Sequence, residues 1–224
     1  MATSSVARKA KPHQRYYLKN GNLVPGVTTV LSVINKPALV PWANRLGLEG
    51  IKSSEYVDEL ADIGTLAHHL IQCHLTARAP DISDYTPQQV SLAENAVSSF
   101  QAWARGKAVE TRQTEWPLVS ETHRFGGTLY WYGTVNGRPT LIDFKTGRAI
   151  YDDHVYQIAA YHQLLIENGY EVDEVRVLQV GRSEDDGFSE RVLPDPAIKP
   201  YWKVFQAALL LKGVIDATKE RREQ

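Results

Sequence analysis

The stretch 141–147, with the sequence LIDFKTG, constrains this chain of 224 residues more than any other feature. Its apolar residues predict a β-strand, in which alternate side chains share a face, so Asp143 and Lys145 lie together about 6.5–7 Å apart. Phe144 points to the opposite face and into a core. A carboxylate and the Phe144 carbonyl are ligands that Mg²⁺ prefers, and a neighbouring lysine can orient water or stabilise charge on a phosphate. An isolated Asp-x-Lys pair is most often a surface ion pair, so the surrounding sequence has to decide.

The rest of the chain predicts helices first, then strands, then alternating elements. Short helices are expected over 28–34 and 40–46, and longer amphipathic helices over 55–75 and 87–106, the last with Thr86 as its N-cap. Strands are expected over 109–119, 125–135 and 140–146, with Asn136-Gly137 as a hairpin turn. A helix over 154–168, strands over 175–180 and 188–193 and a closing helix over 196–222 follow. A strand–helix–strand crossover after an antiparallel meander predicts the α/β class, with a mixed β-sheet flanked by α-helices.

Charge is distributed unevenly along the chain. Seven Lys and Arg residues and no acidic residue precede Glu49, so residues 1–48 carry +7 and the rest carries −8. This asymmetry indicates a basic surface beside an acidic or metal-binding region. Residues 1–13 are expected to be a disordered basic tail, either simply solvated or in contact with a partner, and residues 14–224 to form one domain.

Composition excludes several classes of protein. One cysteine, Cys73, leaves no disulfide framework, four-cysteine zinc site or iron–sulfur cluster, and a reducing cytoplasm is the expected location. No apolar run reaches the roughly 18–20 residues that a membrane span needs.

Short motifs in a fixed order surround the Asp-x-Lys strand. They are Gly64-Thr-x-x-His68, Glu115, Gly126-Gly127, Asp143-Phe-Lys145-Thr146 and Gln157-x-x-x-Tyr161, preceded by the segments 24–31 and 36–43. Over about residues 16–165 this set resembles the RecB-type branch of the PD-(D/E)XK nuclease superfamily, from phages and bacteria. The resemblance implies a restriction-endonuclease-like core and hydrolysis of DNA with Mg²⁺ or Mn²⁺, often as an exonuclease acting on single strands or duplex ends. It also implies a partner protein of recombination, repair or replication.

The resemblance also implies a role for each matching residue. The catalytic residues would be Asp143, Lys145, Glu115, Gln157 and Tyr161, and the metal ligands would be His68, Asp143 and the Phe144 backbone carbonyl. Candidate DNA contacts are Lys36, Trp42, Arg45 and Thr146. Trp42 lies between the basic residues Lys36 and Arg45 in the sequence and can stack on a nucleobase, although tryptophans more often anchor a core. Relatives with an iron–sulfur cluster need several cysteines, which excludes that subtype.

The sequence departs from the family's pattern at one position. The family has Gly-Gly-x-x-Asp where this chain has Gly126-Gly127-Thr128-Leu129-Tyr130, so Tyr130 occupies the position of the main metal-binding aspartate. A neutral phenol is a poor Mg²⁺ ligand. Three hypotheses follow: the fold persists as a non-catalytic module that binds DNA or protein, the metal relies on the other ligands and on a carboxylate such as Glu115, or the tyrosine is an introduced, inactivating substitution.

Overall fold

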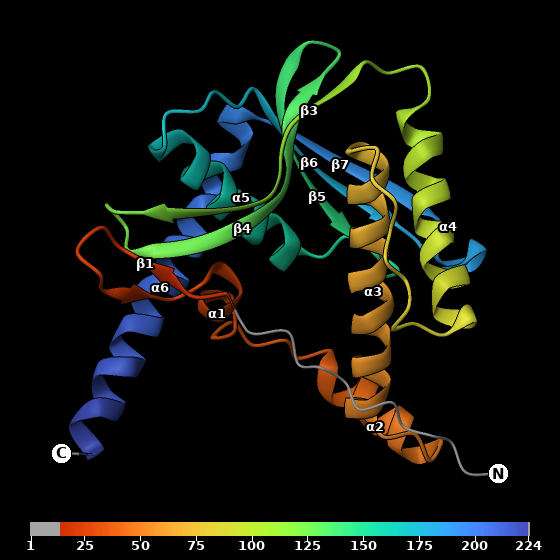
Figure 1. Ribbon diagram of the computed structural model, residues 1–224. Coiled ribbons are helices and arrows are strands. Elements are labelled where there is room, and N and C mark those ends of the chain that lie inside the picture. Colours follow the sequence, from red (N-terminus) through yellow and green to blue (C-terminus); the bar gives the residue numbers. More distant parts are fainter. Residues whose placement is uncertain (1–13, 224) are drawn as a thin grey trace.

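The computed structural model describes residues 14–223 (Figure 1), so the predicted basic tail over residues 1–13 lies outside the described residues. Five strands form the main sheet: β3 (Val109–Ser120), β4 (Phe125–Val135), β5 (Arg138–Lys145), β6 (Glu174–Val180) and β7 (Phe188–Pro194). The helices are α1 (Val27–Leu31), α2 (Leu39–Leu48), α3 (Ser53–Leu75), α4 (Pro87–Ala104), α5 (Asp152–Glu167) and α6 (Asp195–Glu223), with a short 3₁₀ turn η1 (Glu184–Asp186). A small hairpin of β1 (Tyr16–Tyr17) and β2 (Leu23–Val24) precedes them.

The main sheet has the order β3-β4-β5-β6-β7 and is mixed. Strands β5 and β6 are parallel and joined by α5, whereas the other neighbours are antiparallel. The turn between β4 and β5 has positive φ at both Asn136 and Gly137, 53° and 79°, as expected of a tight two-residue hairpin. The predicted α/β class, with a mixed sheet flanked by helices, is therefore confirmed.

Two hydrophobic clusters cover the two faces of the sheet (Figure 1). Helices α1, α5 and α6 pack on one face with Leu141, Val175 and Val177, and α3 and α4 pack on the other with Ile142 and Phe144. The alternation predicted for β5 is therefore confirmed. It sends Asp143 to the α5 face and Phe144 to the α3 face, at the point where β5 ends.

Strand β4 breaks this alternation at Tyr130 and Trp131. A regular strand would put Tyr130 and Tyr132 on one face, but Tyr132 belongs to the α5-side cluster while Tyr130 and Trp131 both pack on the α3 side. Opposite Tyr130, Glu115 has a φ of 49°, which interrupts the extended backbone of β3. A positive φ within a strand turns the neighbouring side chains away from the regular alternation. As a result, Tyr130 is turned toward α3. The register shift of β3 lies elsewhere in the strand, between Thr111 and Gln113.

Most predicted elements lie within a few residues of their observed ends. Thr86 caps α4 with a complete capping box. Its hydroxyl accepts a hydrogen bond from the Gln89 backbone N–H, and the Gln89 side-chain oxygen accepts one from the Thr86 backbone N–H. The first helix was predicted too long: α1 ends at Leu31, and residues 32–36 form an irregular segment. Within residues 14–223, no helix combines the length and the apolarity that crossing a membrane requires.

Candidate active site

The end of β5 places Asp143 and Lys145 side by side, as the sequence predicted. Asp143 is fully buried, and Lys145 Nζ lies 2.8 Å from its Oδ2 atom. The two side chains form a buried ion pair. Burial raises the pKa of Asp143, and the positive charge of Lys145 opposes that shift.

Helix α5 holds the lysine in place through a chain of hydrogen bonds. Lys145 Nζ donates to Gln157 Oε1 at 2.8 Å, and Gln157 Nε2 donates to the Tyr161 hydroxyl at 2.8 Å. Gln157 and Tyr161 stand four residues apart, so both project from one helix face over the end of β5. The predicted Gln-x-x-x-Tyr motif therefore acts as a support that fixes the position of the ammonium group.

Two glycines permit the close packing that this site needs. A Cβ on Gly127 of β4 would lie 2.6 Å from a ring carbon of Tyr161, so any larger residue at position 127 would displace that ring. A Cβ on Gly64 of α3 would lie 3.0 Å from the Thr146 hydroxyl. Gly64 therefore brings α3 against the chain just after β5. Thr146, a predicted DNA contact, lies at this crossing of α3 and the end of β5.

His68 reaches the site from α3, on the opposite side of β5 from Gln157. Burial and, to a smaller extent, the charge of Lys145 lower the pKa of His68 to about 3, although a hydrogen bond with the Phe144 backbone opposes the shift. The imidazole is therefore neutral at physiological pH, which is the form that binds metals. Within the described residues, its Nδ1 atom is buried without a hydrogen-bond partner.

Tyr130 lies directly against His68. The two ring centroids are 4.0 Å apart in an edge-to-face arrangement, so the phenol occupies space next to the predicted metal ligand. Burial raises the pKa of Tyr130 well above its usual value, and the charges of Asp143 and Glu115 raise it further. Glu115 therefore lies near enough to Tyr130 to act on it electrostatically, as its place opposite Tyr130 between β3 and β4 predicts.

The donor atoms fit a divalent cation in kind but form a small set. Asp143 offers two buried oxygens, one of which is ion-paired with Lys145, and His68 offers one buried nitrogen without a hydrogen-bond partner. A buried polar atom without a partner destabilises a fold unless a ligand satisfies it. Across residues 14–223, however, no group of three His, Cys, Asp or Glu side chains is arranged to hold a metal. Tyr130 lies against His68, at the position where the family's pattern has a carboxylate.

The predicted DNA contacts lie in different surroundings. Lys36 Nζ forms an ion pair with Asp153 of α5 at 2.6 Å, beside the active site. Trp42 packs against Tyr56 of α3 with ring centroids 6.2 Å apart, which favours an anchoring role over base stacking. Arg45 is exposed in the last turn of α2.

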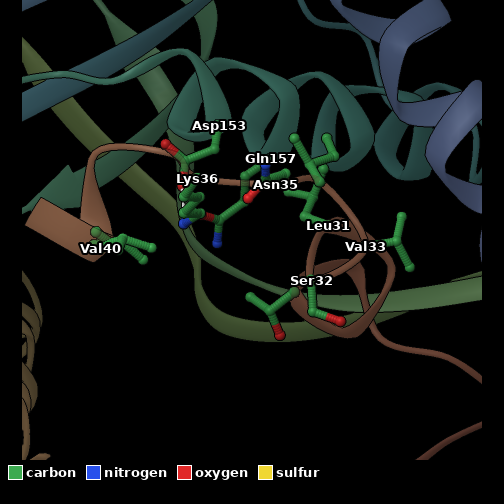
Figure 2. A pocket seen from close by; sticks show the side chains of 11 residues that line it. Leu31, Ser32, Val33, Asn35, Lys36, Val40, Asp153 and Gln157 are labelled. Atoms are coloured by element: carbon green, nitrogen blue, oxygen red, sulfur yellow. Dashed lines mark hydrogen bonds and ion pairs between the residues drawn. The ribbon is translucent and has the colours of Figure 1, made fainter.

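Two further residues near the site, Asp153 and His154, were not predicted from the sequence. Asp153 lines a cavity of about 610 Å³, together with Lys36 and Gln157 (Figure 2). Next to Asp153, His154 accepts a hydrogen bond from the Tyr151 backbone, and burial and Lys145 lower its pKa to about 4. Since Asp153 and His154 stand four and three residues before Gln157, helical spacing could have found both.

Comparisons with known proteins give weak similarities. No family model and no curated protein matches the chain. The crystal structure of LHK-Exo in complex with dAMP is 14% identical with a TM-score of 0.37, and the match covers 74% of this chain and 90% of that one. The crystal structure of SSO0001 is 13% identical with a TM-score of 0.30, and the match covers 55% of this chain and 66% of that one, just under two thirds of its length.

Proposed function

We propose that this chain is a divalent-metal-dependent DNA nuclease whose active site lies at the end of β5. The observation that carries the proposal is the buried carboxylate of Asp143, which forms an ion pair with Lys145, together with a buried, neutral His68 whose Nδ1 atom lacks a hydrogen-bond partner. Two such groups, placed next to a lysine that is itself fixed by hydrogen bonds, suit a cation and a phosphate better than they suit a protein core. The motif order in the sequence supports DNA as the substrate. It also supports a role in bacterial or phage recombination, repair or replication, in the cytoplasm.

Asp143, His68 and the Phe144 carbonyl are the groups that would hold Mg²⁺ or Mn²⁺. A bound cation would neutralise phosphate charge and activate water. The chain's own residues would supply the positive charge that binds the phosphate and the groups that hold this charge in place. Lys145 offers a fixed positive charge to the oxygens of a phosphate, and its hydrogen bond to Gln157 prevents the ammonium from rotating away. Gln157 is in turn held by Tyr161.

Cleavage of labelled linear DNA tests the proposal. Single-stranded and duplex substrates are incubated with Mg²⁺ or Mn²⁺, with EDTA as the metal-free control. Lys145→Ala should reduce the rate by about 10²–10³-fold, the usual effect of removing one preorganised electrostatic group. Lys203→Ala, an exposed lysine on α6, removes the same charge away from the site and should leave the rate unchanged. Equal cleavage by the two variants would refute the assignment of Lys145.

A second function is favoured by Tyr130. Because its ring lies against His68 in place of a carboxylate, the fold can serve as a DNA-binding module without hydrolysis. This alternative predicts DNA binding in EDTA that weakens steeply with salt, since phosphate contacts release counterions. It also predicts no cleavage by the chain at any metal concentration. Detectable cleavage that Lys145→Ala abolishes would exclude it.

A further inference from the structure

The main sheet has two edge strands, β3 and β7, which differ in how well they are protected against pairing with a further strand (Figure 1). Sheet edges are commonly protected by exposed charges and by irregular backbone. On β3, Glu110 and Arg112 are exposed. The register with β4 shifts beside these residues, and Glu115 has a φ of 49°. Strand β3 is therefore a poor template for another strand.

Strand β7 is regular, and its outer edge is open. All seven of its residues pair with β6 without a register shift. Within residues 14–223, no second strand pairs with it. Two apolar side chains are accessible on β7, Phe188 at 44% and Val192 at 40% exposed. Because these residues are four positions apart in a strand, their side chains share one face of the sheet.

The hydrogen bonds that flank β7 show which of its peptide groups are free. The Gly181 N–H donates to the Gly187 carbonyl at 3.0 Å, and the Asp195 N–H donates to the Asp173 carbonyl at 2.9 Å. Peptide groups alternate in direction along an antiparallel strand, so the odd-numbered residues between Gly187 and Asp195 also face β6. The even-numbered residues point their backbone groups outward. They are Phe188, Glu190, Val192 and Pro194, and the proline contributes only a carbonyl.

The charged side chains of β7 are held by other parts of the chain. Glu190 Oε1 accepts a hydrogen bond from Trp103 at 3.0 Å and lies 2.5 Å from a guanidinium nitrogen of Arg176. Arg191 donates to the Tyr201 hydroxyl at 2.6 Å. Free charges on an edge repel an incoming strand, whereas these two are already paired. The edge therefore lacks the electrostatic protection that its sequence suggests.

We propose that two copies of the chain associate through β7, in an antiparallel strand pair with Glu190 on the two-fold axis. Such an axis brings the same surface of both copies together and keeps each side chain on its face of the sheet, so even-numbered residues oppose even-numbered ones. Phe188 of each copy then lies opposite Val192 of the other, and an aromatic residue opposite a β-branched one is a favourable pair. The three opposing pairs exchange about six backbone hydrogen bonds.

This register is self-complementary, which identifies the occupant of the edge as a second copy. The two Glu190 carboxylates that meet at the axis are each neutralised by their own Arg176. The alternative register, with Arg191 on the axis, would bring two guanidinium groups together. It would also place Phe188 opposite Pro194, which has no N–H to donate. The first register therefore satisfies more backbone groups with less repulsion.

Sedimentation velocity over a range of protein concentrations tests for the dimer. A single strand pair buries less than the about 1,200 Å² of stable complexes, so a reversible dimer with a dissociation constant of about 10–100 µM is expected. Val192→Pro removes an outward N–H from each copy and leaves the bonds to β6 intact, so it should weaken the dimer about ten- to hundredfold. Val192→Thr, which keeps both the N–H and the β-branched shape, is the matched control and should change the constant less than threefold.

Cysteine cross-linking tests the register independently of any proline. In the proposed pair, the two Cα atoms of residue 190 lie about 5.5 Å apart, which suits a disulfide. Glu190→Cys should therefore give a covalent dimer under mild oxidation. Arg191→Cys, one residue away, should not, because a cysteine there would cross-link only in the alternative register. The unmodified chain is the background control, since its Cys73 is buried.

The inference is supported by a concentration-dependent dimer that Val192→Pro weakens, Val192→Thr retains and Glu190→Cys cross-links. A chain that stays monomeric at every concentration, with no cross-link through residue 190, would overturn it and leave the edge to a strand of another protein. Equal dimer affinity of a folded Val192→Pro, checked by circular dichroism, would assign the contact to a different surface. Preferential cross-linking through residue 191 would refute the proposed register.

Discussion

Restoring a carboxylate at residue 130 is the most informative perturbation of this site. Tyr130→Asp would replace a neutral phenol with an acidic ligand beside His68 and Asp143. If His68 and Asp143 belong to a cation site, the new carboxylate completes a group of three ionisable ligands. Binding of Mg²⁺ or Mn²⁺ should then become tighter.

The expected gain can be estimated from the attraction between charges. At a separation of about 4 Å, two unit charges attract by about 4 kcal/mol at an effective dielectric constant of about 20. Repulsion from Asp143 and the desolvation of a second carboxylate offset much of this attraction. A net gain of about 1.4–2.8 kcal/mol is therefore expected, which is about ten- to hundredfold in the dissociation constant for the cation.

Calorimetric titration with Mn²⁺ measures this change directly. The matched control is Tyr130→Asn, which has the size of aspartate and removes the same ring but carries no charge. Cleavage of single-stranded DNA is followed at a metal concentration below saturation, where a tighter site gives a higher rate. Far-ultraviolet circular dichroism confirms that both variants retain the fold, since each removes a largely buried ring.

Two results would refute the reasoning. Equal tightening by Tyr130→Asn and Tyr130→Asp would show that loss of the ring, not gain of charge, is responsible. No tightening by a folded Tyr130→Asp would place residue 130 beyond reach of the cation. If instead the substitution creates cleavage that the starting chain lacks, the non-catalytic function is correct for the chain with tyrosine.

Three further predictions concern stability. Because the pKa of His68 falls to about 3 on folding, the unfolded chain binds the extra proton between about pH 6.5 and pH 3. As the pH is lowered through this range, His68 should reduce the free energy of unfolding by about 1.4 kcal/mol per pH unit. Urea titrations at several pH values should show a weaker dependence of this free energy on pH for His68→Gln. An unchanged pH dependence would contradict the burial of a neutral imidazole. Gly127→Ala, whose methyl group would meet Tyr161, should lower stability by about 1–3 kcal/mol. Gly213→Ala on α6, where a Cβ meets nothing within 4 Å, should raise it by about 0.5–1 kcal/mol in thermal unfolding.

The parts of the site that follow from local periodicity could be predicted from the sequence. Two-residue spacing placed Asp143 and Lys145 on one strand face, and four-residue spacing placed Gln157 and Tyr161 on one helix face. The hairpin at Asn136-Gly137 fixed the pairing of β4 with β5. These rules depend only on backbone geometry, so tertiary packing had little opportunity to override them.

The parts that depend on irregular backbone could not be predicted. The positive φ of Glu115 and the break in alternation at Tyr130 depend on how β3 and β4 curve against α3. The early end of α1 at Leu31 is similar, because it frees the segment that forms one wall of the cavity. No periodic pattern records either feature. The contact between Lys36 and Asp153 joins residues 117 positions apart, which sequence spacing alone cannot bring together.

The energetics of Asp143 and His68 bear on whether the site still has a ligand. Asp143 is buried as the ion-pair partner of Lys145, whereas His68 Nδ1 is buried without a hydrogen-bond partner. An unsatisfied buried group costs about 1–3 kcal/mol, a substantial part of the 5–15 kcal/mol that stabilises a typical domain. Apolar side chains at both positions would extend the surrounding cores at lower cost. Tyr130 does not relieve this penalty, because its neutral ring leaves His68 Nδ1 unpaired. A cation bound at His68, as proposed above, would pair with this nitrogen and would relieve the penalty.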